Sequence, residues 1–190
     1  MNRVHQVVLI FSTLYGSWLG MQDVHESGHV AAAWLTGGRV SKVVLYPLTI
    51  SRTALSEDPR PLVVVWGGPL VGAALPLAFW LSARAMQLRG DFVLRFFAGF
   101  CLIANGAYIG VGSISRIGNA QVMLTHGAER WHLWLFGVLT APAGLWLWHG
   151  LGPHFGLGKA DGTVSRIVAY VTFACCLALF TMGFAFGGRD

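Results

Sequence analysis

Charged residues are scarce in this chain. Asp, Glu, Lys and Arg make up only 11% of its 190 residues, whereas soluble globular proteins carry about 25%. Hydrophobic residues make up 55%, and the mean hydropathy is +0.60. This apolar content excludes a disordered chain, and its 25 glycines follow no collagen-like period. The length suits a single domain.

Cysteine is also scarce. Cys101, Cys175 and Cys176 all lie in apolar runs, where a thiol usually packs as a small hydrophobic group, so a disulfide framework is excluded. The net charge of +5 comes from 13 basic residues. These are scattered among apolar segments and form no nucleic-acid motif, so we expect no nucleic-acid partner.

Long stretches without charged residues give the organisation of the chain. A membrane-spanning helix needs about 20 mostly apolar residues, and five such stretches are present. We therefore expect an all-α polytopic membrane protein with about five transmembrane helices, forming a single membrane domain over residues 1–190 in a lipid bilayer. The expected spans are residues 7–35, 61–83, 92–117, 131–151 and 164–187. Composition does not indicate an oligomeric state.

The segment between the first two expected spans has a different character. Residues 39–57 are rich in Val, Ile, Thr and Tyr and are interrupted by Pro47, which predicts one or two short strands with a turn. An open strand edge is too costly in hydrocarbon. We therefore expect this strand-like element at the interface or covered by protein.

One motif in the first span indicates metal chemistry. His25-Glu26-Ser27-Gly28-His29 is an H-E-x-x-H sequence. On a helix the two histidines lie about 40° apart in rotation, so both imidazoles can bind one Zn²⁺. Glu26 can then take a proton from a water whose pKa the metal lowers. Gly28 leaves the helix surface bare beside His29, where a substrate backbone could approach.

Chance does not readily explain this motif. About 0.004 matches are expected in a chain with three glutamates and seven histidines. Ionisable groups within a span are costly and mark functional sites. The alternatives are a hydrogen-bonded polar patch between helices, or a small transporter or proton relay built on the same groups.

Three stretches of sequence resemble a known family. MQDVHESGHVAAAWLTGG, from Met21, resembles the first zinc-binding span of the site-2 proteases, which are the intramembrane zinc metalloproteases of peptidase family M50. GGPLVGAALP, from Gly67, and NGAYIGVGSISRIGNAQVML, from Asn105, extend the similarity over most of residues 20 to 130. The chain resembles the compact bacterial type, and its last two expected spans match nothing we can name.

The resemblance implies a third zinc ligand, which in the family is an aspartate in a Gly-Asp-Ala setting. The matching position holds Asn119, whose neutral amide oxygen is a weaker donor to Zn²⁺ than a carboxylate. His126, Asp161 and Asp23 are alternative third ligands. Asp23 lies about 200° around the helix from His25, which suits a supporting role better than a ligand role.

Two functions remain open at this point. The resemblance implies a zinc-dependent endopeptidase that hydrolyses peptide bonds in or near transmembrane segments of membrane proteins, with Zn²⁺ on His25, His29 and Asn119 and with Glu26 as the catalytic base. It implies a bacterial inner membrane, with the metal near the cytoplasmic face. Asn105 would order the substrate backbone or the zinc water, or form a helix–helix hydrogen bond. The alternative is a catalytically inactive relative that binds membrane helices as a scaffold because Asn119 replaces the aspartate.

Overall fold

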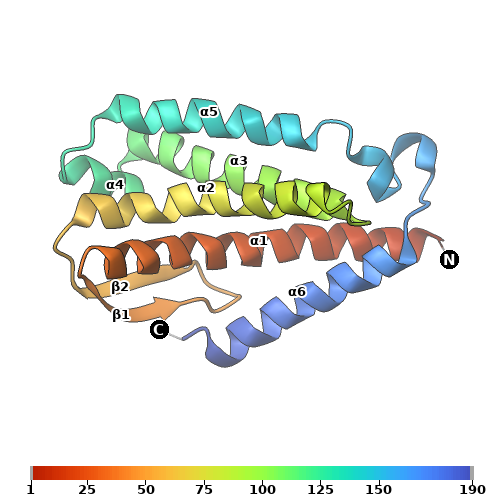
Figure 1. Cartoon of the computed structure of the whole chain (residues 1–190), viewed down its shortest axis with the longest axis horizontal. Helices are drawn as coiled ribbons and strands as arrows, with labels where there is room; N and C mark the ends of the chain where they lie inside the picture. The colour runs from red at the N-terminus through yellow and green to blue at the C-terminus, as the bar shows by residue number, and fades with distance from the viewer. Residues whose placement is uncertain (1, 189–190) are drawn as a thin grey trace.

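The computed structural model describes residues 2–188 and is dominated by long helices (Figure 1). The order of elements is α1 (Asn2–Leu35), β1 (Arg39–Val44), β2 (Arg52–Glu57), α2 (Pro61–Ala85), α3 (Asp91–Ser115), α4 (Gly118–Thr125), α5 (Arg130–Trp148), the short 3₁₀ turns η1 (Gly152–Phe155) and η2 (Gly158–Ala160), and α6 (Arg166–Phe186).

The central element is α1, which contacts α2, α3 and α6. In Figure 1, α2, α3 and α5 lie on one side of α1, and the hairpin of β1 and β2 lies on the other side together with α6. The last turn of α6 approaches the start of the hairpin loop, where Leu45 N–H donates to Gly187 O at 2.5 Å. The hairpin is therefore held between α1 and the end of α6.

Local sequence explains where these elements begin and end. Helix α1 ends where Gly37 adopts a φ of +81°, a left-handed conformation that favours glycine. Helix α2 begins at Pro61, whose missing N–H costs nothing in the first turn. Pro69 and Pro76 lie inside α2, which continues to Ala85. Sequence composition predicted neither the short helix α4 nor the 3₁₀ turns.

The two strands confirm the strand-like element expected over residues 39–57. They pair antiparallel, with Val43 opposite Thr53 and Val44 opposite Arg52, and the register shifts on both sides of Val40. The side of the hairpin that carries Val40 and Leu55 packs against buried residues of α1 and α2, namely Ala32, Ala33 and Val64.

Three helices, α2, α3 and α6, are long and apolar enough to cross a membrane by length and composition. These agree with three of the five expected spans. Helices α1 and α5 do not meet that criterion, so crossing by these two stays a prediction. Helix α1 falls short because it carries polar residues throughout its length, and they face the protein interior: His5, Gln6, Ser12, Thr13, Ser17, Gln22, His25, Glu26 and His29.

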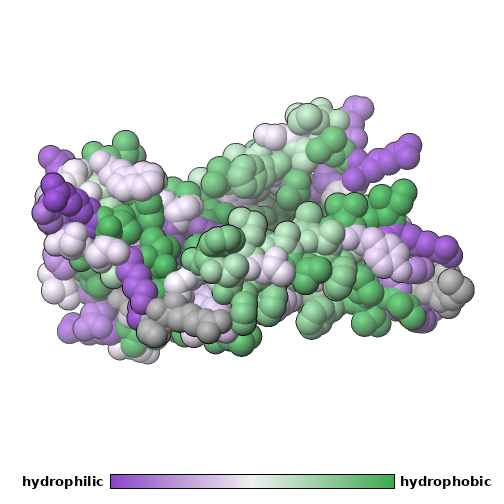
Figure 2. All heavy atoms as spheres, turned by 90° about the horizontal axis from the view of Figure 1, so that it is seen from below, coloured by the Kyte–Doolittle hydropathy of each residue, from purple (hydrophilic) through white to green (hydrophobic). Residues whose placement is uncertain are grey.

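Most of the exposed residues of α1 are apolar instead. Val4, Val7, Phe11 and Leu14 are all exposed, which is the reverse of the pattern on a helix that faces water. On the face drawn in Figure 2, polar residues gather at the two ends of the long axis and apolar residues cover most of the surface between them. This distribution suits a surrounding of lipid chains, in which polar groups must find partners within the protein.

Candidate metal centre

The two histidines of the motif point at each other. His25 and His29 are only 7% and 8% exposed, and their Nε2 atoms lie 3.1 Å apart. The Nδ1 atom of His25 lies 2.6 Å from Asn105 Oδ1, and the Nδ1 atom of His29 lies 2.8 Å from Val64 O. Both oxygens only accept hydrogen bonds, so each Nδ1 carries the proton. Each Nε2 therefore presents a lone pair to the same point.

Asn119 comes to that point from another helix. Its Nδ2 atom lies 2.9 Å from His25 Nε2 and 3.0 Å from His29 Nε2. A half-turn of the amide about χ2 exchanges Nδ2 and Oδ1, which would place the oxygen donor at the same point. The structure therefore brings Asn119 to both histidines of the motif.

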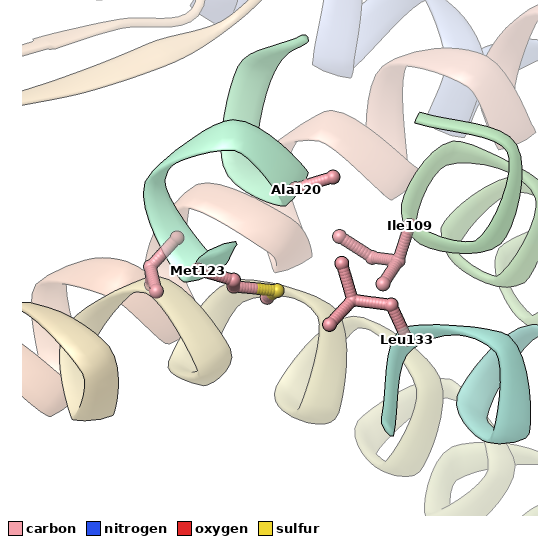
Figure 3. Packing of buried hydrophobic residues seen from close by; sticks show 5 residues of the cluster. Ile109, Ala120, Met123 and Leu133 are labelled. Carbon is pink, nitrogen blue, oxygen red and sulfur yellow. The ribbon is translucent and has the colours of Figure 1, made fainter. Parts of the chain in front are cut away.

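The turn between α3 and α4 and a small apolar cluster hold Asn119 in place. Arg116 ends α3 in a left-handed conformation, with a φ of +53°, and Asn119 N–H then donates to Tyr108 Oη at 3.2 Å. The adjacent Ala120 and Met123 are fully buried (Figure 3). They pack in one cluster with residues of three other helices: Val65, Ile109 and Leu133.

Glycines of α2 form the surface beneath the imidazoles. A Cβ atom on Gly68 would overlap the His29 ring and lie 2.9 Å from His25 Nε2. A Cβ on Gly28 would overlap the carbonyl oxygen of Gly67. The bare surface at Gly28 is therefore taken up by the backbone of α2. This corrects the expectation that a substrate approaches there, and the physical reason is close helix–helix packing.

Asn105 lies behind the His25 ring. It is 1% exposed, with Oδ1 on the His25 ring and Nδ2 donating to Cys101 O at 2.8 Å. Of the two roles considered, the structure shows the helix–helix hydrogen bond. By accepting from His25 Nδ1, Asn105 fixes the tautomer and the direction of that imidazole, which is the usual task of a partner behind a metal-binding histidine.

Glu26 faces the hairpin. Its carboxylate is buried, at 4% exposed, and accepts from Ser51 Oγ at 2.8 Å on Oε1 and from Thr53 Oγ1 at 2.7 Å on Oε2. One turn earlier on α1, Gln22 Oε1 accepts from Ser51 N–H at 2.8 Å. Sequence reasoning missed Ser51 and Thr53. Their i, i+2 spacing in the strand-like segment was the available signal, since it places both on one face.

These groups line a cavity of about 620 Å³. His25, Glu26, His29, Asn105 and Asn119 all border it. The rest of the lining is largely apolar and comes from α1, α2, α4 and the hairpin, including Met21, Val64, Val122, Ile50 and Leu55. The cavity is the kind of concave, mostly apolar site with a few convergent polar groups that binds ligands.

The other candidate ligands lie elsewhere. Asp161 pairs with Arg3 at 2.5 Å, near the start of α1, and thus about 30 Å along that helix from His25. His126 is exposed and its Nδ1 atom bonds to Val122 O. Asp23 does not border the cavity. Within residues 2–188 no group of three or more His, Cys, Asp or Glu side chains could hold a metal, because the third position at this centre holds an asparagine.

A family model identifies the family of the chain. The model of the Peptidase M50B-like family matches residues 21–138, more than half of the chain, and includes every residue of the centre. The chain therefore belongs to the Peptidase M50B-like family. With its three apolar helices, it is an integral membrane protein related to peptidases.

One curated relative and the solved structures add little to this assignment. The chain is 35% identical to Protein crumbs homolog 2 of Mus musculus over 104 residues. These residues make up 55% of this chain. The chain spans only 7% of the length of that protein. No solved structure matches the chain significantly.

Proposed function

We propose that this protein is a zinc-dependent intramembrane endopeptidase that hydrolyses peptide bonds in or near transmembrane segments of membrane proteins. The observation that carries the proposal is the convergence of His25 Nε2, His29 Nε2 and the Asn119 amide on one point, in a cavity that Glu26 also borders. Family membership supports the reaction class.

The residues present fit a zinc ion. Two unprotonated imidazole nitrogens that face each other at 3.1 Å need a donor or a cation beside them. The Asn119 amide N–H groups fill this role in the structure, and a zinc ion would fill it once the amide turned its oxygen toward the rings. Asn105 and Val64 O fix the two rings from behind, which is the arrangement that supports zinc-binding histidines. His25, His29 and the Asn119 oxygen would be the protein ligands. Bound Zn²⁺ polarises a carbonyl and acidifies water.

The chain's own residues would perform the remaining steps. Glu26 takes a proton from the attacking water and later gives it to the leaving amine, which is the task of a general base and acid. The apolar lining excludes bulk water from the scissile bond. An unwound substrate segment would pair with the hairpin by strand addition, because β2 lines the cavity and belongs to a two-stranded sheet with open edges.

The apolar surface and the family resemblance support a proposal for the substrate class and for the membrane location. The apolar surface between the two polar ends (Figure 2) and the largely apolar lining of the cavity suit a transmembrane protein substrate that reaches the cavity from the bilayer. The bacterial inner membrane, with the metal near the cytoplasmic face, is the proposed location on the ground of the resemblance to compact bacterial members of the family.

Metal content and cleavage, measured together on purified protein, test this proposal. The probe is a detergent-solubilised fusion protein with one apolar segment of about 20 residues. We expect one zinc per chain and cleavage in the parent, loss of both in His29→Ala, and loss of cleavage with retained zinc in Glu26→Ala. Zinc absent from the parent but present in Asn119→Asp would contradict the proposal and indicate the inactive scaffold instead.

A further inference from the structure

The hairpin bonds to both oxygens of the Glu26 carboxylate. Ser51 lies directly before β2 and Thr53 is the second residue of that strand. Because side chains alternate along a strand, the two hydroxyls share one face, and Arg52 between them is exposed. That face lies against α1, and each hydroxyl donates to a different oxygen of Glu26.

We propose that Ser51 and Thr53 are positioning residues for Glu26, and that their hydroxyls fix its carboxylate in the orientation in which it exchanges protons with the attacking water and the leaving amine. This inference rests on the proposed function. It assigns to the hairpin a task in the reaction itself, in addition to pairing with a substrate strand.

The contacts leave Glu26 free to act. A carboxylate has about four lone-pair positions, two on each oxygen. The hydroxyls of Ser51 and Thr53 use one on each oxygen, so one on each remains for the proton that is transferred. A glutamate has three rotatable side-chain bonds, and without these partners the carboxylate would sample several rotamers within the cavity.

The hairpin is itself held firmly enough to position another group. At one end, Leu45 N–H donates to Gly187 O beyond α6. At the other, Leu55 packs against Ala32 and Val64. Thr53 lies between these anchors and pairs with Val43 of β1. A side chain on such a supported element can keep a reacting group in place, and a displacement of about 1 Å there can cost roughly 100-fold in rate.

Substitutions that remove only the hydroxyls test the inference. We expect the double variant Ser51→Ala/Thr53→Val to lower kcat on the fusion substrate by about 10- to 100-fold and to change KM less than about twofold, because the lost contacts are to Glu26 and not to substrate. Ser51→Thr and Thr53→Ser keep the hydroxyls and should restore most of kcat. In a Glu26→Ala background the double substitution should cause no further loss.

Matched controls exist on the same hairpin. Thr49 Oγ1 donates to Tyr46 O and Ser56 Oγ to Arg39 O, and neither bonds to Glu26. Thr49→Val and Ser56→Ala should therefore leave kcat unchanged. A similar loss of kcat in these controls, or an unchanged kcat in Ser51→Ala/Thr53→Val, would overturn the inference while the proposed function stands.

Hydrogen–deuterium exchange separates this inference from the proposed function. Hydrogen bonds to charged groups are strong, so we expect amides of residues 45–57 to exchange about tenfold faster in Glu26→Ala than in the parent. A parent without zinc or cleavage would contradict the proposed function. In that case faster exchange would still support the carboxylate–hydroxyl contacts, and unchanged exchange would overturn them.

Discussion

The two sides of the candidate centre are built in different ways. The floor, formed by His25, His29 and Asn105 with the glycines of α2, is packed helix against helix, and its polar atoms are almost wholly buried. The rim, formed by the hairpin and α4, is partly exposed. It is attached by hydrogen bonds to Glu26 and the imidazoles and by two small apolar clusters, one under α4 and one under the hairpin.

The difference separates two tasks. Backbone contacts such as Gly28 against Gly67 leave no room for adjustment, so the floor fixes the direction of the imidazoles. At the rim, side-chain hydrogen bonds reach Glu26 and the imidazoles from elements outside the helix packing of the floor. Substitutions in the floor should therefore affect metal binding most, and substitutions in the rim should affect it less.

The largest loss is expected at Gly68. An added Cβ would overlap the His29 ring, so Gly68→Ala must push the imidazoles apart. We expect zinc affinity to fall by more than about 100-fold, beyond the range typical for partners behind a ligand. Gly110→Ala is the matched control, since its Cβ would meet an ordinary contact at 3.4 Å on Gly137. Competition with a chromogenic chelator measures the zinc affinity of both variants. Equal zinc affinities in Gly68→Ala and Gly110→Ala would contradict the claim that the floor is rigid.

A smaller loss is expected at Asn105. Replacing it by leucine removes the acceptor that holds His25 Nδ1, which should lower zinc affinity by about 10- to 100-fold. Ser113→Ala is the control, because Ser113 is equally buried on α3 but its hydroxyl bonds to Gly110 O and Trp134 Nε1, away from the imidazoles. Isothermal titration with zinc after chelation gives the comparison. An Asn105→Leu protein with parental affinity would show that the ring needs no such partner.

A substitution in the apolar cluster beneath Asn119 should lower the zinc affinity less than Asn105→Leu does. Met123→Ala leaves a cavity under α4 (Figure 3) and should lower the free energy of unfolding by about 2–5 kcal/mol. The affinity for zinc should fall less than in Asn105→Leu, because both imidazoles stay fixed. Gln121→Ala, at an exposed position of the same helix, should change neither quantity. Unfolding in mixed micelles and zinc titration check the two expectations.

The smallest effect is expected at the alternative ligands. Asp161 and Arg3 form an ion pair whose side chains are 85% and 69% exposed, and such pairs contribute about 0–1 kcal/mol. Asp161→Ala and His126→Ala should leave the zinc stoichiometry and affinity at parental values. A drop in zinc content in either variant would contradict the assignment of the metal to His25, His29 and Asn119.

The sequence predicted those parts of the molecule that depend on short spacing. His25 and His29 are four residues apart, so their convergence follows from helix geometry alone. The charge-free stretches and the Val- and Thr-rich segment likewise predicted the long helices and the hairpin, because hydropathy and strand propensity are local properties.

Features that depend on contacts between helices and strands could not be predicted from the sequence. The bare surface of Gly28 is occupied by α2, which nothing in the motif itself indicates. Asn105 could equally have faced a substrate, and only the position of α3 beside α1 brings it to His25. Ser51 and Thr53 reach Glu26 because the hairpin folds back along α1, and the spacing of the two residues predicts a shared face without saying what that face meets.

X-ray absorption at the zinc edge tests the central claim most directly. In protein purified with stoichiometric zinc, the account predicts two imidazole nitrogens at about 2.0–2.1 Å from the metal with oxygen donors completing the shell. His29→Ala should lose one imidazole contribution or the metal itself. A parent that retains no zinc, or a spectrum that does not change when His29 is replaced, would contradict the claim that these two imidazoles hold the ion.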